Sequence, residues 1–331
     1  MDRIYIIAEM ACSHEGELER ALKIIDGAAK ASADAVQLQI WSLSHMMAPQ
    51  RKEYELLKKI ELSHGNWTEL VKYTRKKYPE MQVYVCVYEH SSIDFIDSMG
   101  VDGYKLNSSD LSNPLVLEKV AATYKPINLS IGASTVDEIQ AAIERIQAVS
   151  KSRITLMYGH QNFPTSIKDI HLNYMVKLME LFELPIGYQD HCDASSEAAF
   201  WIPALSAGMG VSILEKHITH DRSLKGVDYE SALNPCEFKR FVSMVRELES
   251  AKGISIPKPL SPDELKYRQF QKKSIVAAHN LKVGTQLQKT DINYLRAEEL
   301  GIPPDKADKI INRIIKRDII AHQIIREDDL S

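Results

Sequence analysis

The chain has 331 residues, of which 44% are hydrophobic, a length and composition that predict one large core and a smaller second one. Its formal net charge is only -4 and its basic residues are spread along the sequence, which excludes a concentrated basic surface, so we expect small-molecule partners and neither nucleic acid nor membrane. The sequence also predicts a cytoplasmic protein, because the N-terminus lacks a secretory signal, no apolar stretch approaches the roughly 20 residues that span a bilayer, and the cysteines show no paired spacing.

Short apolar or β-branched runs alternate with amphipathic segments up to residue 252. Eight such runs are predicted as strands, at 4–8, 35–39, 82–87, 103–106, 127–131, 154–158, 186–188 and 211–214. A strand followed by a helix, repeated eight times, is typical of a parallel sheet closed into a barrel, since an open doubly wound sheet usually has fewer strands. The predicted fold class is therefore α/β, a (β/α)8 TIM barrel.

The segments between these strands have helical periodicity. In residues 18–33 and again in residues 136–149, apolar side chains recur every three or four positions and would form one face of a helix. Thr135 precedes the second segment, and its spacing to Glu138 predicts a capping box at the start of that helix.

The pattern changes after residue 252, where we place a domain boundary. Residues 1–252 are expected to form the barrel, and residues 253–270, rich in proline and charge, an ordered or semi-rigid linker. Residues 271–331 are expected to form a small β-rich domain. It contains a weak repeat, because LKVGTQLQKTDI (281–292) matches IIAHQIIREDDL (319–330) in its apolar and acidic positions.

Polar side chains stand at the ends of most predicted strands. The active site of a (β/α)8 barrel is built at the carboxyl ends of its strands. An unpaired buried charge is strongly destabilising, so ionisable groups at these positions favour a functional role over a packing role. The positions are Glu9, Gln37, Gln39, Lys105, Ser108, Ser130, Gln161, Asp190, His191, Glu215 and His217.

Two histidines occupy neighbouring strand ends. His191 follows the seventh predicted strand and His217 ends the eighth, so their imidazoles would lie side by side at the barrel mouth. Two such nitrogens can ligate a divalent metal. Since two histidines fill only part of a coordination shell, water and substrate would occupy the rest, as in an open catalytic site.

Eight short motifs stand in the order found in one enzyme family. They are IAEMACSHEG, ADAVQLQ, YKLNSSD, LSIGAS, FPT, DH, ILEKHIT and KGVDYESALNP. With these motifs the chain resembles the N-acetylneuraminate (sialic acid) synthase family, the NeuB-like enzymes that include legionaminic and pseudaminic acid synthases, over nearly its full length. The resemblance implies a TIM barrel joined to a C-terminal antifreeze-like (SAF) domain, a domain-swapped homodimer, and Mn2+ or Mg2+ as the cofactor.

The resemblance also implies roles for individual residues. The family's metal ligands fall on His191 and His217. Glu9, Lys105, Glu215 and Asp228 carry the implied catalytic roles, and for Glu9, Glu215 and Asp228 the role is proton handling. The implied phosphoenolpyruvate contacts are Lys105, Ser108, Ser130 and Gln161, and the implied sugar contacts are Glu9, Gln39, Phe163 and Asp228. The alternatives are a surface lysine at Lys105, ordinary turn hydroxyls at the serines, and structural ion pairs at the carboxylates.

The chain departs from the family at five of its implied substrate-binding positions. Gln37, Val87 and Gln189 stand where members usually carry Lys, Thr and Ser, all associated with holding phosphoenolpyruvate. Asp110 replaces a usual Glu. The sugar-contacting Arg of many members aligns with Ala297, next to Arg296, which would have to take its place from the partner's small domain.

The implied reaction joins phosphoenolpyruvate to the aldehyde of an N-acetylated amino sugar. N-acetylmannosamine and a diacetamido-trideoxyhexose are both compatible with the sequence. Three alternatives remain: a Kdo-like or aromatic-pathway sugar-acid synthase, which normally lacks the small C-terminal domain, a non-catalytic binder of sugar or phosphate, and a structural dimer whose tail does the binding. The changes at Gln37 and Val87 lend the binder some support.

Overall fold

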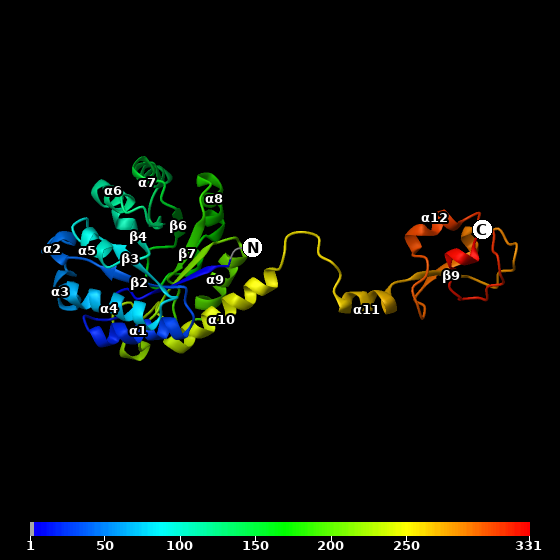
Figure 1. Ribbon diagram of the computed structural model, residues 1–331, viewed down its shortest axis with the longest axis horizontal. Helices are drawn as coiled ribbons and strands as arrows, with labels where there is room; N and C mark the ends of the chain where they lie inside the picture. The colour runs from blue at the N-terminus through cyan, green and yellow to red at the C-terminus, as the bar shows by residue number, and fades with distance from the viewer. Residues whose placement is uncertain (1–2) are drawn as a thin grey trace. The chain divides into compact units, whose positions relative to one another are not determined.

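The computed structural model describes residues 3–331, so the first two residues of the predicted barrel domain lie outside it. The chain divides into two compact units, Met1–Gly253 and Ile254–Ser331 (Figure 1). The segment expected to be a linker, 253–270, contains most of helix α11 (Pro262–Gln271), which begins at a capping box formed by Ser261 and Glu264.

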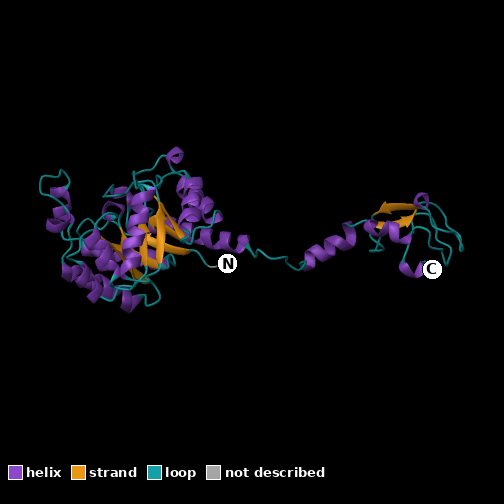
Figure 2. Cartoon of the chain, turned by 90° about the horizontal axis from the view of Figure 1, so that it is seen from above, coloured by secondary structure: helices purple, strands orange, loops and turns teal. Residues whose placement is uncertain are grey.

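In the first unit, eight strands are paired in sequence order and close into a parallel barrel. Figure 2 shows these strands in orange, surrounded by helices. They are β1 (Tyr5–Glu9), β2 (Ala35–Ile40), β3 (Gln82–Val87), β4 (Gly103–Leu106), β5 (Ile127–Ser130), β6 (Ile154–Tyr158), β7 (Ile186–Asp190) and β8 (Ile213–His217). The predicted α/β class and (β/α)8 barrel are confirmed.

Ten helices accompany the barrel strands within the described residues. They are α1 (Leu18–Lys30), α2 (Leu43–Met46), α3 (Tyr54–Ile60), α4 (His64–Lys77), α5 (Ile93–Ser98), α6 (Pro114–Ala121), α7 (Val136–Val149), α8 (Leu172–Phe182), α9 (Ala198–Gly208) and α10 (Pro235–Lys252). None of the helices in residues 3–331 has both the length and the apolar character needed to cross a bilayer.

The last two strands of the barrel extend further than predicted. The apolar runs ended at residues 188 and 214, before the first polar or charged positions, whereas β7 runs to Asp190 and β8 runs from Ile213 to His217, the residue that the histidine argument had placed at the end of the eighth strand. The predicted boundaries were wrong because the polar side chains that follow find partners in the interior. Lys216, for example, is fully buried and forms an ion pair with Asp190.

Side chains along each strand alternate between two environments, as the period of a β-strand requires. Ile6 and Ala8 pack in the large core cluster between the barrel and its helices, whereas Ile7 packs inside the barrel. Inside, Ile7 belongs to an apolar layer with Ala35, Tyr84, Met157 and Ile213. This layer fills the barrel toward the amino ends of the strands. The inward side chains nearer the carboxyl ends therefore face the mouth of the barrel.

Glycines make room for the large members of this interior layer. A β-carbon at Gly103 on β4 would collide with the ring of Tyr84, and one at Gly187 on β7 would collide with the sulfur of Met157. The absent side chains therefore allow two bulky residues to fill the barrel interior.

The second unit is a small domain with its own apolar core. Its strands β9 (Ser274–Ala277) and β10 (Ile292–Leu295) pair antiparallel, and a short helix α12 (Ala307–Ile310) follows. The two copies of the predicted repeat share one local structure, in which an aspartate accepts a hydrogen bond from the backbone N–H three residues before it. Asp291 accepts a hydrogen bond from the Gln288 N–H at 2.8 Å, and Asp329 accepts one from the Arg326 N–H at 2.9 Å.

Helix α7 begins at the predicted capping box of Thr135 and Glu138. The Thr135 hydroxyl accepts the Glu138 N–H at 3.2 Å, and the Glu138 carboxylate accepts the Thr135 N–H at 2.7 Å. We expect Thr135→Ala to lower the free energy of unfolding of the barrel by about 1 kcal/mol, because one N–H of the first turn loses its acceptor. Urea unfolding followed by tryptophan fluorescence measures this, since Trp41, Trp67 and Trp201 all lie in the first unit.

Glu138→Gln is the matched control, because glutamine also completes a capping box. Its free energy of unfolding should stay within a few tenths of a kcal/mol of the wild type. Equal destabilisation by both variants would contradict the assigned role of the threonine hydroxyl.

Candidate active site

The register of the parallel strands brings predicted site residues from distant parts of the sequence to one level of the barrel. On β1, Glu9 lies opposite Gln37 of β2 on one side and opposite His217 of β8 on the other. Glu215 of β8 lies opposite Gln189 of β7. These strand ends share one rim, so inward side chains from five strands, β4 included, converge at the barrel mouth.

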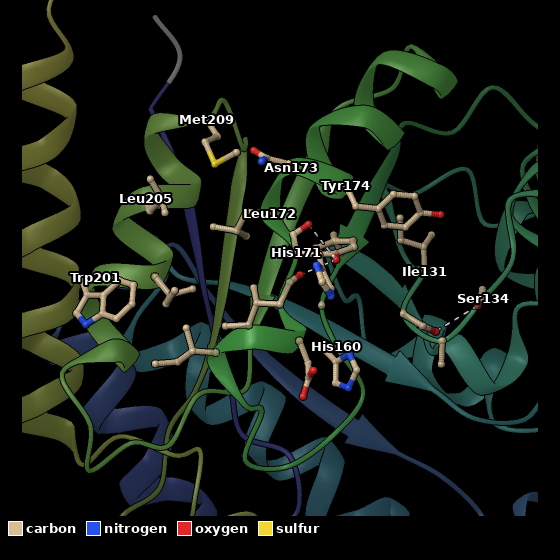
Figure 3. Close-up of a pocket in the computed structure, with 18 of the residues that line it drawn as sticks. Ile131, Ser134, His160, His171, Leu172, Asn173, Tyr174, Trp201, Leu205 and Met209 are labelled. Carbon is tan, nitrogen blue, oxygen red and sulfur yellow. Dashed lines mark hydrogen bonds between the residues drawn. The ribbon is translucent and has the colours of Figure 1, made fainter.

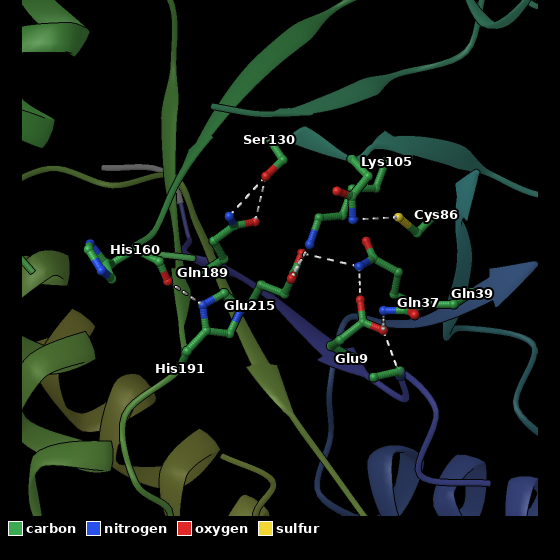
Figure 4. Close-up of polar contacts among 12 residues, drawn as sticks. Glu9, Gln37, Gln39, Cys86, Lys105, Ser130, His160, Gln189, His191 and Glu215 are labelled. Carbon is green, nitrogen blue, oxygen red and sulfur yellow. Dashed lines mark hydrogen bonds and ion pairs between the residues drawn. The ribbon is translucent and has the colours of Figure 1, made fainter. Parts of the chain in front are cut away.

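Four of these residues form one buried network (Figure 4). Lys105 forms an ion pair with the Oε1 atom of Glu215. The Gln37 amide nitrogen donates hydrogen bonds to Glu9 and, at 3.2 Å, to Glu215, so that it bridges the two carboxylates. Among residues 3–331, Lys105 is the only cationic side chain bonded to either carboxylate.

Glu9 is held by further donors on its own strand end and on β2. Its Oε1 atom accepts the Ala11 N–H at 2.6 Å and the Gln39 amide at 3.2 Å. Burial nevertheless raises the pKa of Glu9 to about 7, and the nearby charge of Glu215 acts in the same direction. Glu9 is therefore able to hold or release a proton near neutral pH.

The pKa of Lys105 moves in the direction that keeps it charged. Burial alone would lower this pKa, but the adjacent Glu215 and then Glu9 outweigh burial and hold it above its usual value. The network thus contains one fixed positive charge, which is available to an anionic ligand only if that ligand competes with Glu215.

Ser130 and Gln189 form a second contact in the barrel interior. The Gln189 amide nitrogen donates to the Ser130 hydroxyl at 2.9 Å, and both side chains are buried. Gln189 also packs against Gly159, where a β-carbon would collide with it. The glutamine therefore fills space and occupies a hydroxyl that the resemblance assigns to phosphoenolpyruvate.

His191 and His217 lie together on the other side of the mouth. Their ring centroids are 5.3 Å apart, and the ring of Phe163 lies 4.4 Å from that of His191. The Nδ1 atom of His191 lies 3.0 Å from the carbonyl oxygen of His160. Because a carbonyl only accepts, Nδ1 carries the proton and the Nε2 lone pair of His191 is free.

Both imidazoles are suited to bind a metal ion. Burial lowers the pKa of His191 to about 4, and burial followed by the neighbouring His191 lowers the pKa of His217 well below its usual value, so both are neutral at physiological pH. The Nδ1 atom of His217 is buried and has no hydrogen-bond partner in the described chain. Within residues 3–331, no set of three or more His, Cys, Asp or Glu side chains is grouped as metal ligands would be.

Asp228 lies on the rim beside the N-terminal strand. Its carboxylate accepts the Cys12 N–H at 3.2 Å, and burial raises its pKa. Cys12 also belongs to an apolar cluster that walls this side of the mouth, together with Trp41, Leu43, Ile60, Met46, Met47, Tyr54, Leu57, Tyr88 and Val227. The predicted sugar contacts Gln39 and Asp228 therefore stand next to an apolar wall.

The remaining predicted residues are less closely joined to the network. Ser108 is half-buried at the start of a short 3-10 helix, and Asp110 uses its carboxylate within the same turn, where it accepts bonds from Ser109 and Asn113 at 2.9 Å. Gln161 is half-buried after β6. Val87 packs in the core cluster between barrel and helices.

Arg296 belongs to the second unit, where it is exposed directly after β10. Its predicted contact with the sugar at a partner's barrel stays a prediction.

The structure adds groups that the sequence interpretation did not single out. The Ala11 N–H and the His160 carbonyl are backbone groups, for which a sequence has no signal. Lys216 is the exception, because a lysine inside the apolar run of β8 was visible and marks a buried charge that needs a partner.

A separate hollow of about 1190 Å³ lies outside this network, along the N-terminal ends of α7 and α8 and the side of α9 (Figure 3). Its lining includes Ser134, Tyr174, Trp201 and Leu205, together with His160. We place the candidate active site at the barrel mouth instead, because the buried ionisable groups with shifted pKa values converge there.

Known proteins resemble the chain over most of its length. The model of the NeuB family matches residues 24–256, and the model of the SAF domain matches residues 272–331. The chain is 32% identical to the uncharacterized protein MJ1065 of Methanocaldococcus jannaschii, over 98% of this chain and 94% of that protein. It is 30% identical to the N,N'-diacetyllegionaminic acid synthase of Legionella pneumophila, over 96% of this chain and 92% of that protein.

A solved structure also resembles the chain, at a sequence identity similar to that of the two relatives above. The N-acetylneuraminic acid (sialic acid) synthetase of Leptospira borgpetersenii, determined in complex with citrate, superposes with a TM-score of 0.73 at 28% identity. The match covers 81% of this chain and 92% of that one.

The raised pKa of Glu9 predicts a pH dependence of stability. In the folded protein Glu9 keeps its proton up to about pH 7, whereas an unfolded glutamate loses it near 4.5. The folded state therefore binds more protons between these values, and the wild type should lose stability relative to Glu9→Gln as the pH rises through this window. Urea unfolding of both proteins from pH 5 to pH 8.5 measures the difference.

Glu89→Gln is a control with the opposite sign. The hydrogen bonds from Ser91 and Ser92 outweigh burial and hold the pKa of Glu89 below its usual value, so its ionised form stabilises the fold at neutral pH. A stability difference between wild type and Glu9→Gln that does not change with pH would contradict the assignment of a raised pKa to Glu9.

Proposed function

The chain belongs to the NeuB family, and from that premise we propose that it condenses phosphoenolpyruvate with the aldehyde of an N-acetylated amino sugar to give a nonulosonic acid and phosphate. It is a carbon–carbon bond-forming synthase of the sialic acid synthase type. The proposal depends on one observation. Two neutral histidines, with ring centroids 5.3 Å apart, lie beside the buried ion pair of Lys105 and Glu215. The site thus combines a metal-binding face with a cation for an anionic donor.

On the donor side, Lys105 would bind the carboxylate or phosphate of phosphoenolpyruvate. A lysine is a compact positive charge with three donors, and the Ser108 and Ser130 hydroxyls would add hydrogen bonds to the same anion. For this, Ser130 has to exchange its bond with Gln189, and Lys105 has to share its charge between Glu215 and the ligand.

On the acceptor side, His191 and His217 would hold Mn2+ or Mg2+. When bound, the cation would polarise the aldehyde oxygen of the sugar and stabilise the negative charge that develops on it. The ring of Phe163 lies beside His191 and would contact the sugar, and Gln39 and Asp228 would bind its hydroxyl groups.

In the proposed reaction, the carboxylates of Glu9 and Asp228 would transfer the protons. The third carbon of phosphoenolpyruvate attacks the aldehyde carbon, a water molecule adds to the second carbon, and phosphate leaves with its bridging oxygen. Glu9 has a pKa of about 7, so it can accept one proton from that water and deliver it to the oxygen of the former aldehyde, while the second proton of the water leaves with the phosphate. Asp228, whose pKa burial raises, is the second candidate.

The acceptor is N-acetylmannosamine or a diacetamido-trideoxyhexose. The apolar wall around Trp41, Tyr88 and Val227 favours a sugar with acetamido methyl groups or deoxygenated carbons next to Gln39. The legionaminic acid synthase among the relatives supports the second sugar class.

Assembly and location form part of the proposal. A domain-swapped homodimer would cover the apolar side chains Leu265, Tyr267 and Phe270, which helix α11 leaves exposed, and would bring Arg296 to a partner's sugar site. The four cysteines carry free thiols, which suits the reducing cytoplasm.

A non-catalytic binder of sugar or phosphate is the second candidate. Gln37 supplies no charge where the family usually has Lys, and Gln189 occupies the Ser130 hydroxyl. Both features would weaken the binding of a phosphorylated donor without affecting the binding of the sugar. A Kdo-like synthase fits less well, because the SAF domain at residues 272–331 is normally absent from such enzymes.

The activity itself is the direct test. We expect phosphate release when the protein is incubated with phosphoenolpyruvate, Mn2+ and one of a panel of N-acetylated hexosamines, and a loss on the order of 100-fold for His191→Ala, which removes a metal ligand. Replacement of the exposed His64 by Ala should leave the rate unchanged. Failure of every sugar to release phosphate would favour the binder, and full activity of His191→Ala would contradict the metal site.

Donor binding tests the role of Gln37. We expect Gln37→Lys to lower the KM for phosphoenolpyruvate about 10-fold, because a charge-assisted hydrogen bond is stronger than a neutral one. Gln37→Met is the matched control, since it keeps the volume without a charge and should raise that KM. A KM for phosphoenolpyruvate that does not change in Gln37→Lys would contradict a donor position next to Gln37.

A further inference from the structure

A second buried ion pair lies directly behind the two histidines. Lys216 of β8 pairs with the Oδ2 atom of Asp190 of β7, and the Tyr188 hydroxyl donates to Asp190 Oδ1 at 3.0 Å. Lys216 is 0% and Asp190 1% exposed. In residues 3–331, only this pair and Lys105–Glu215 have both side chains less than a tenth exposed.

The strand register fixes the relation of this pair to the histidines. Asp190 lies opposite Lys216 in the β7–β8 ladder, and each precedes a histidine by one residue. Because side chains alternate along a strand, the ion pair occupies the outer face of the barrel wall and the histidines the inner face. The pair therefore joins the same two strands that carry His191 and His217, at the point where those side chains emerge.

The surroundings of this ion pair are largely apolar. Tyr188 and Leu214, on the same outer face, pack in the large apolar core between barrel and helices. An ion pair in such a place is often no more stabilising than apolar side chains of similar volume, and its advantage is a defined geometry. The backbone carbonyls of both histidines are held as well, since His191 accepts from the Thr165 N–H at 2.8 Å and His217 from the Leu233 N–H at 2.9 Å.

We propose that Asp190 and Lys216, braced by Tyr188, are positioning residues that set the spacing of His191 and His217 for one divalent cation. The inference rests on the metal site of the proposed function. Groups behind the ligands of a metal commonly orient them, and their loss weakens metal binding by about 10- to 100-fold. The ion pair does so here by fixing two adjacent strands rather than by bonding to an imidazole.

The experiment measures metal binding directly, without catalysis. Mn2+ affinity of the full-length protein is determined by titration calorimetry, and Co2+ absorption reports the geometry of the site. The double variant Asp190→Asn/Lys216→Met leaves no unpaired charge in the core, and we expect it to bind Mn2+ about 10- to 100-fold more weakly, with an altered Co2+ spectrum. Lys216→Arg retains the ion pair and should bind within about threefold of the wild type.

Arg246→Met is the matched control for a purely structural effect. Arg246 pairs with Asp34, whose side chain is 8% exposed, beyond the other end of the barrel strands. Its loss should lower the Tm and leave the Mn2+ affinity unchanged. Tyr188→Phe covers the case in which the double variant does not fold, because it removes one hydrogen bond and should weaken Mn2+ binding several-fold.

The outcomes separate this inference from the proposed function. Mn2+ binding by the wild type, with unchanged affinity in the double variant or in Tyr188→Phe, overturns the inference and leaves the metal site in place. No Mn2+ binding by the wild type overturns both. Weaker binding in the double variant, together with retained binding in Lys216→Arg and Arg246→Met, supports it.

Discussion

Lys105 and Glu215 meet inside the barrel, where both side chains are less than a tenth exposed. An ion pair in such a place is stable only when further groups complete its hydrogen bonds, and here the Gln37 amide donates to Glu215 as well as to Glu9. The Gln37 amide bridges two carboxylates, one of which is paired with the cation of Lys105. The raised pKa of Glu9 and the charged state of Lys105 both follow from this arrangement.

On the histidine side of the mouth the ionisable groups are neutral rather than charged. Burial works against charge there as well, and for His191 it outweighs the charges of Glu215 and Asp190, so that His191 and His217 both remain neutral. Neutral imidazoles are the form that binds metals. One barrel rim thus carries a region that keeps a positive charge and a region that keeps two free lone pairs, which suits a reaction between an anionic donor and a polarised aldehyde.

The departures from the family concentrate on the donor side. Gln37 replaces a usual cation by a neutral bridge, and Gln189 fills the space next to Ser130. The histidine pair and Asp228 carry no such change. In the proposed reaction the chain would therefore combine an unchanged acceptor side with an altered donor side, and Lys105 would be the one cation of the network that binds phosphoenolpyruvate.

The sequence by itself determined the eight-stranded barrel, the separate C-terminal domain and the strand ends at which the site lies, because hydrophobic periodicity and chain order are local properties. Only the tertiary structure decided which residues meet. The Gln37 bridge between Glu9 and Glu215 and the pairing of Lys216 with Asp190 depend on strand register across a closed barrel. The apolar runs alone ended β7 and β8 too early, because the polar residues that complete these strands are buried only with the partners that the closed barrel supplies.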